Sequence, residues 1–183
     1  MRSLNASNTL AAMILALFCL LALPPLASAG PLPAEVSKLV SAVITNNEAQ
    51  ARAALAAGAD VNADTGEGRT ALIVAAMASR PQMVKLLLEK GADTARRTRD
   101  PTIGNALTAA FWGQNGPRLT GSERTDPASH ATALEVLKLL APRTQDLNLP
   151  VRRGSGPMTA MQIAKQAGAA DVIAILLQAG AAP

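Results

Sequence analysis

Side chains that carry most metal and catalytic chemistry are scarce in this chain. Its 183 residues include no Tyr, one His, one Cys, one Trp and two Phe. The single Cys, Cys19, lies in an apolar run near the N-terminus, so a disulfide within one chain is excluded. A zinc site needs three or four suitably spaced ligands, and one His among scattered carboxylates does not provide them. The sequence therefore predicts no metal, no cofactor and no catalytic residue.

Strong positive charge and stacking aromatics are also missing. The formal net charge is +4, and Phe and Trp together make up 2% of the residues. Nucleic-acid-binding domains generally carry a strongly basic face, and many add aromatic side chains that stack on bases. This composition therefore argues against nucleic acid as a partner.

The first 29 residues have the composition of a secretory signal peptide. Arg2 precedes an uncharged apolar run from Leu10 to Leu23, and Ala27-Ser28-Ala29 supplies small residues at the cleavage position. The run is shorter than the ~20 residues that a membrane-spanning helix needs. We therefore predict cleavage after Ala29, export to the periplasm of a bacterium or beyond, and no stable membrane insertion of the mature chain. An uncleaved signal that anchors the protein to the membrane is the alternative.

Two glycine-containing segments lie one structural repeat apart. Gly58-Ala59-Asp60 and Gly91-Ala92-Asp93 are separated by 33 residues, and each follows an Ala- or Leu-rich stretch. A fixed period near 33 residues indicates stacked repeats. A later copy ends at Gly180, where Ile175-Leu176-Leu177 matches Leu86-Leu87-Leu88.

Four copies share this frame. We place them at about residues 33–57, 58–90, 91–141 and 142–183, with an insertion at residues 113–130 in the third copy. One repeat cannot bury its apolar face alone, and about three are needed for stability. Residues 30–183 are therefore expected to form one repeat domain.

The repeated pattern resembles that of ankyrin-repeat proteins, and the second copy matches best. It contains Thr70-Ala71-Leu72, Ala75-Ala76, Val84 to Leu88 and Gly91-Ala92-Asp93. The resemblance implies an all-α ankyrin-repeat solenoid of about four helix-turn-helix repeats with protruding β-turn fingers. It also implies a non-catalytic module that binds another protein through the turn fingertips and a concave face.

The chain departs from the family at the His that helps to brace neighbouring turns. That position is Ile73, Thr108 or Gln162 in this chain. We therefore expect the turns to be held by packing and by other bonds. A second expectation concerns the glycines that follow three of the helices, which suit a left-handed conformation. They are Gly58, Gly91 and Gly180.

Arginines recur in the turns between copies. Because equivalent turns align in a stack, these arginines are predicted to form one positive strip that steers an acidic partner. The alternative is ordinary solubilising charge, because acids interrupt the strip. The arginines are Arg69, Arg96, Arg97, Arg99, Arg152 and Arg153, and the acids are Asp64, Glu67 and Asp100. The predicted partner-binding residues are Thr65, Glu67, Arg69, Arg97, Arg99, Asp100, Trp112, Arg152 and Arg153.

His130 is the one candidate for catalysis, and we predict that it precedes a helix at Ala131–Leu140. A general base needs a nucleophile and an orienting partner in reach, and Ser129 and Asp126 are close only in sequence. A solvent-facing residue at a helix start is the favoured interpretation.

The insertion in the third copy follows Phe111-Trp112, which we expect to close a helix. Trp is frequent at binding hot spots, but it also suits packing of the insertion onto the helices, which we favour. The insertion is expected to project as a loop that is either part of the binding face or merely tolerated. Its glycines do not form a P-loop, because the required Lys-Ser/Thr is absent. They are Gly113, Gly116 and Gly121.

Together these features predict a small exported bacterial ankyrin-repeat protein that is not an enzyme. Two binding roles are open: an accessory or chaperone factor for a periplasmic enzyme, or an immunity protein that occludes a toxin. A hydrolase that uses His130 is the least favoured function.

Overall fold

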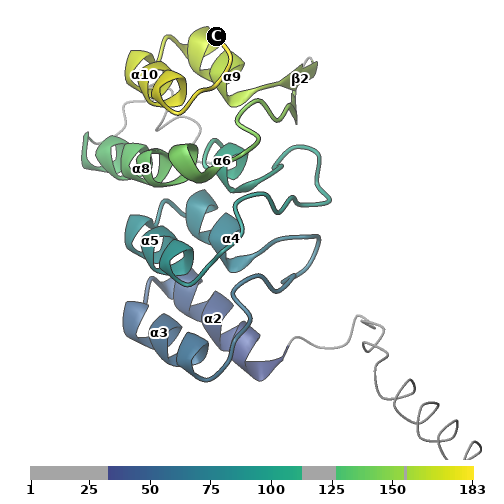
Figure 1. Cartoon of the computed structure of the whole chain (residues 1–183), viewed down its shortest axis with the longest axis vertical. Coiled ribbons are helices and arrows are strands. Elements are labelled where there is room, and N and C mark those ends of the chain that lie inside the picture. Colours follow the sequence, from purple (N-terminus) through teal and green to yellow (C-terminus); the bar gives the residue numbers. More distant parts are fainter. Residues whose placement is uncertain (1–32, 113–126, 155) are drawn as a thin grey trace, which may run out of the picture. The chain divides into compact units, whose positions relative to one another are not determined.

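The computed structural model describes residues 33–112, 127–154 and 156–183, all within one compact unit, Leu32–Pro183. The helices of this unit stack in successive pairs (Figure 1). They are α2 (Ala34–Thr45), α3 (Glu48–Ala56), α4 (Ala71–Met77), α5 (Pro81–Glu89), α6 (Ala106–Ala109), α8 (Pro127–Leu140), α9 (Ala160–Ala167) and α10 (Ala170–Gln178), with a 3-10 helix, η1 (Ala141–Arg143), after α8. The predicted signal peptide and residues 113–126 of the predicted insertion lie outside the described residues.

Each pair has a first helix and a second helix, and long turns join one pair to the next. In Figure 1 the second helices, α3, α5, α8 and α10, lie on the left, and the turns project to the right. The predicted all-α stack is confirmed. The third turn also contains two short antiparallel strands, β1 (Val151–Arg153) and β2 (Gly156–Met158), with Arg152 opposite Pro157. The helical interpretation of the sequence did not include them.

One apolar position recurs in all four pairs and forms the centre of the stack. Leu39, Leu72, Leu107 and Met161 occupy it, and each side chain is at most 2% exposed. A fully buried side chain of this size stabilises the fold by about 2 kcal/mol relative to an exposed one. Small alanines between these positions, such as the fully buried Ala75, let the helices approach closely.

Glycine and proline residues mark several of the helix ends. The three glycines that follow α3, α5 and α10 all have positive φ angles, as predicted. These are Gly58 at 94°, Gly91 at 82° and Gly180 at 94°. At the other end of a helix, Pro81 occupies the first turn of α5, where its missing N–H has no intrahelical partner to lose.

Two predicted helix boundaries in the third pair were wrong. The helix expected at Ala131–Leu140 begins at Pro127, so the last four residues of the predicted insertion belong to α8. Proline suits the first helical position, and this was the overlooked signal. The helix expected to close at Phe111-Trp112 ends at Ala109, and both residues continue in a turn whose N–H groups donate three residues back.

Candidate functional site

Three turns project from the stack and contain most of the predicted binding residues. We call them finger 1 (residues 60–70), finger 2 (residues 93–105) and finger 3 (residues 146–159), and together the finger row. Backbone hydrogen bonds join them in series. The Arg99 N–H donates to the Glu67 carbonyl at 2.7 Å, and the Arg152 N–H donates to the Pro101 carbonyl at 2.8 Å. The structure therefore brings the predicted turns together in one connected row.

The tip of finger 1 is shaped by one carboxylate and lies against finger 2. Asp64 accepts hydrogen bonds from the backbone N–H groups of Gly66 and Gly68, at 2.8 and 2.9 Å. A side chain at Gly68 would place its Cβ 2.8 Å from the Arg97 carbonyl oxygen, so only glycine allows this close approach. Thr65 closes the same finger, because its N–H donates to the Arg69 carbonyl at 2.7 Å.

At its base, each finger ends on a residue that caps the following helix. The side chain of the cap residue accepts a hydrogen bond from the backbone N–H three positions later, which is the usual N-cap arrangement. The caps are Thr70, Asn105 and Thr159, and the residues three positions later are Ile73, Thr108 and Gln162.

These three later residues stand where the family has its bracing His. Ile73 is 1% exposed and acts by packing. Thr108 and Gln162 each complete a capping box, in which their side chains accept from the cap residue's own N–H, at 2.9 Å in both cases. The turns are therefore held by packing and by other bonds, as expected from the absence of the family's bracing His.

Two asparagines also brace neighbouring repeats, although the sequence analysis gave them no role. The Asn62 side chain donates to the Gly91 carbonyl at 3.2 Å and accepts from the Asp93 N–H at 2.8 Å. Asn148 accepts from the Ala182 N–H at 3.1 Å. The shared Asp-x-Asn pattern at residues 60–62 and 146–148 was the available signal.

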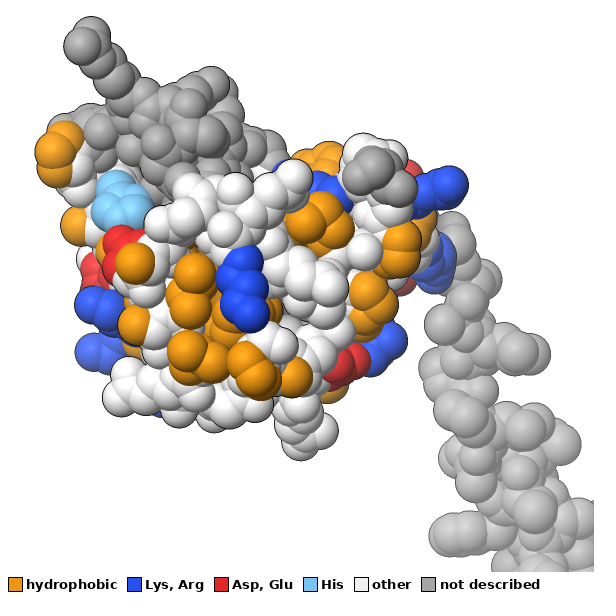
Figure 2. Space-filling model, turned by 90° about the horizontal axis from the view of Figure 1, so that it is seen from above, with side chains coloured by type: hydrophobic (Ala, Val, Ile, Leu, Met, Phe, Trp, Pro, Cys, Tyr) orange, Lys and Arg blue, Asp and Glu red, His pale blue; other side chains and the backbone are white. Residues whose placement is uncertain are grey.

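Charges in the finger row are largely paired within the chain. Arg69 pairs with Glu67 at 2.9 Å, Arg99 pairs with Asp64 at 3.3 Å, and Arg97 pairs with Asp146. Figure 2 shows side chains of both signs on the side where the fingers project. The row contains six arginines and six acids, so it is a strip of mixed charge and not a uniformly positive strip.

Asp100 belongs to this pattern but is used mainly within finger 2. Its carboxylate accepts hydrogen bonds from the Thr102 hydroxyl at 2.5 Å and from the Thr102 N–H at 2.8 Å. These bonds hold the pKa of Asp100 below its ordinary value of 3.8, with a smaller contribution from the positive charge of Arg69. Asp100 therefore stays ionised and stabilises the turn.

The two arginines of finger 3 have different surroundings. Arg152 is exposed, and within the part of the chain that the structure describes its side chain forms no ion pair or hydrogen bond. Arg153 turns inward, where it donates to the Phe111 carbonyl and lies 6.0 Å from the centroid of the Trp112 ring. Burial lowers the pKa of Arg153. Arg152 is therefore available to a partner, whereas Arg153 attaches finger 3 to the end of α6.

Trp112 is half-buried and packs against the core beside Arg153. It is the last described residue before the predicted insertion. The glycines of the insertion, Gly113, Gly116 and Gly121, fall outside the described residues.

His130 lies inside α8 and bonds to the neighbouring pair of helices. Its Nε2 is 2.7 Å from Oδ2 of Asp171 on α10. Burial raises the pKa of Asp171. Hydrogen bonds from His130 and the Val172 N–H together outweigh this effect, so the pKa of Asp171 lies below its ordinary value of 3.8. The contact links the third and fourth helix pairs. The predicted position of His130 before a helix was wrong, because the residue lies within α8, and its side chain is 30% exposed.

The described residues form neither a metal site nor a membrane-spanning helix. No three His, Cys, Asp or Glu side chains of the described ranges form a group that could hold a metal ion. None of the helices in those ranges is long and apolar enough to cross a membrane.

Comparison with known proteins identifies the repeats. Residues 32–115, somewhat less than half of the chain, match the family model of ankyrin repeats (3 copies). No curated protein matches the chain. With the stacked helix pairs, the family match shows an ankyrin-repeat solenoid. Such repeats generally mediate protein–protein interaction and are typically non-catalytic.

Proposed function

We propose that this ankyrin-repeat solenoid binds one partner protein through its finger row and concave face, as an accessory or chaperone factor for an exported enzyme. The observation that carries the proposal is the series of backbone hydrogen bonds from Glu67 to Arg99 and from Pro101 to Arg152. These bonds hold the fingertips in one arrangement before a partner arrives. Preorganisation of this kind lowers the ordering cost of binding.

The charge pattern favours a partner whose acidic groups meet finger 3. Arg97 and Arg99 already have carboxylate partners at Asp146 and Asp64, so an incoming acid would compete with these. Arg152 has no such competitor among the described residues. A partner acid opposite Arg152 would therefore gain the full attraction, and this complementary charge would speed association.

The predicted signal peptide supports a partner outside the cytoplasm. The apolar run from Leu10 to Leu23 and the small residues Ala27-Ser28-Ala29 favour a cleaved signal and release into the periplasm. N-terminal sequencing of protein recovered from the periplasmic fraction should begin at Gly30. Recovery of the intact chain from the membrane fraction would contradict cleavage and favour the anchored alternative.

Crosslinking followed by capture from periplasmic extract tests the binding surface. Arg152→Glu reverses a fingertip charge without breaking an ion pair among the described residues. Lys85→Glu is the matched control, because Lys85 is exposed on α5, away from the fingers. We expect the native chain and Lys85→Glu to capture the same acidic partner, and Arg152→Glu to capture at least tenfold less.

Two results would contradict this proposal. Equal capture by Arg152→Glu and Lys85→Glu would remove finger 3 from the binding surface. An activity of the pure protein that disappears in His130→Ala, with the far-UV circular dichroism spectrum unchanged, would instead make the protein an enzyme. The enzymatic activity of the captured partner, measured with and without the repeat protein, distinguishes an accessory factor from an inhibitor of a toxin.

A further inference from the structure

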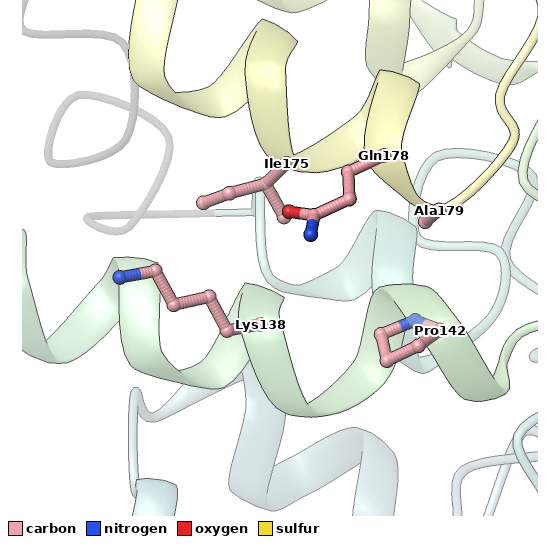
Figure 3. A pocket seen from close by; sticks show the side chains of 5 residues that line it. All are labelled: Lys138, Pro142, Ile175, Gln178 and Ala179. Carbon is pink, nitrogen blue, oxygen red and sulfur yellow. The ribbon is translucent and has the colours of Figure 1, made fainter.

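A groove runs between the second helices of the last two pairs. Its volume is about 350 Å³, and it lies between α8 with η1 on one side and α10 on the other. The lining residues are Lys138, Pro142, Ile175, Gln178 and Ala179 (Figure 3). These helices lie on the side of the stack away from the fingers (Figure 1), so the groove is separate from the proposed partner-binding surface.

One lining position of the groove has a short side chain in the fourth copy. When the Leu-rich segments of the second helices are aligned, Ala179 takes the position of Lys90 in the second copy and Arg143 in the third. Both of those are long side chains, and the Arg143 guanidinium lies along its own helix, donating to the Leu139 carbonyl at 2.9 Å. The fourth copy has only a methyl group at this position, and Ala179 lines the groove together with Pro142.

The lining combines an apolar surface with one cation. Pro142, Ile175 and Ala179 contribute the apolar part. Lys138 is exposed, forms no ion pair or hydrogen bond through its ammonium group within the described ranges, and is the only ionisable lining residue. Because no carboxylate of the lining neutralises Lys138, the groove favours an anionic ligand.

The arrangement of these groups defines an orientation for a ligand. In Figure 3 the Lys138 ammonium lies toward one end of the groove, below Ile175, and Pro142 and Ala179 lie toward the other end. The Gln178 amide projects between them and has N–H groups to donate. A ligand that fits has an anionic head at the Lys138 end and an apolar body directed toward Ala179.

We propose that this groove binds a small monocarboxylate with a short apolar chain. The carboxylate pairs with Lys138 and accepts from the Gln178 amide, and the chain packs against Ile175, Pro142 and Ala179. The volume is near the lower end of the range for small-molecule sites. Because the ion pair is exposed to water and therefore weak, we expect a dissociation constant of about 1 mM.

Isothermal titration calorimetry of the full chain with sodium octanoate tests the proposal. Octanol and octylamine are the matched probes, because they keep the chain and change only the head group. Saturable binding of octanoate, about threefold tighter than that of either other probe, is the expected result. Equal binding of octanol would show that Lys138 does not select the ligand and would overturn the proposal.

Variants locate the site. Lys138→Met keeps an unbranched side chain of similar length and removes its charge, and should weaken octanoate binding about threefold. Ala179→Leu fills the groove and should abolish binding, and Ala179→Met replaces it as the test if the leucine variant does not fold. Lys85→Met removes the aligned lysine of the second copy and should leave the dissociation constant unchanged. Native-like binding by Lys138→Met, or by a folded Ala179 variant, would overturn the proposal.

Discussion

The bases of finger 1 and finger 2 occupy equivalent positions in neighbouring repeats and are stabilised in different ways. Below finger 1, Ile73 fills an apolar space and offers no polar atom. Below finger 2, the Thr108 hydroxyl accepts from the Asn105 N–H and donates to the Ile103 carbonyl at 2.7 Å. The first base therefore relies on packing and the second on a buried hydrogen-bond network, so equal substitutions should have unequal effects.

The largest difference is expected between two glycines with positive φ angles. Gly104, at φ 74°, lies under finger 2, where an added Cβ would be 2.5 Å from the Thr108 hydroxyl and 2.7 Å from Val151. Gly58, at φ 94°, has nothing within 4 Å of the same added atom. Gly104→Ala should lower the free energy of unfolding by about 3 kcal/mol, from backbone strain plus overpacking.

Gly58→Ala is the control, because it introduces backbone strain without a steric clash. It should lower the free energy of unfolding by about 1 kcal/mol. Urea unfolding followed by far-UV circular dichroism measures both variants. Equal losses would show that the space around Gly104 relaxes without cost.

Substitution of valine for Thr108 and for Ile73, below the two fingers, tests the comparison directly. Thr108→Val preserves shape but leaves the buried Asn105 N–H and Ile103 carbonyl without this partner, which should cost about 2 kcal/mol. Ile73→Val removes one buried methylene from the packed base and should cost about 1 kcal/mol. The midpoints of urea unfolding give the two values. A smaller loss for Thr108→Val than for Ile73→Val would reverse the assignment of the two mechanisms.

The asparagine braces should contribute less, because they are more accessible to water. Asn62→Ala removes two hydrogen bonds that join the first and second copies, at Gly91 and Asp93. We expect a loss of about 1 kcal/mol in the free energy of unfolding. Asn148→Ala removes the single bond to Ala182 and should cost less. Faster amide hydrogen exchange at Asp93 in Asn62→Ala would locate the effect, and unchanged exchange there would argue against a bracing role.

The smallest effect concerns the acid dependence of finger 2. The pKa of Asp100 is lower in the folded chain than its ordinary value of 3.8, chiefly because of the Thr102 hydroxyl. A carboxyl with a lowered pKa stabilises the fold fully above the unfolded pKa, and this contribution is lost as pH falls through the folded value. Thr102→Val should therefore weaken the acid dependence of stability below about pH 4.

Thr132→Val is the control for this measurement, because among the described residues the Thr132 hydroxyl donates to the Ala128 carbonyl within α8 and not to a carboxylate. Thermal unfolding at a series of pH values compares the two variants. Identical acid dependence in Thr102→Val and the native chain would remove Asp100 from the explanation.

Much of the fold followed from local patterns in the sequence. The 33-residue step predicted stacked helix pairs because three of the four pairs repeat the same buried Leu and three end on a Gly. The boundaries in the third pair were missed where the repeat is interrupted, and the Pro127 signal was overlooked. The strands of finger 3 were also missed, because three residues per strand carry too short a pattern to stand out from a turn.

For the candidate site, sequence identified the turns but not the state of their charges. Arg97 and Asp146 are 49 positions apart, and Arg99 and Asp64 are 35 apart. Such pairs depend on how neighbouring fingers pack. The inward position of Arg153 likewise depends on Phe111 and Trp112, which no local pattern connects to finger 3.

The sequence by itself determined the repeat architecture, the helix caps and the glycines at helix ends, because these depend on residues within a few positions of one another. Only the tertiary structure decided which arginines remain available and that a groove opens beside Ala179. Those features arise between repeats, where Coulomb attraction, hydrogen-bond geometry and side-chain volume act across segments that are distant in the chain.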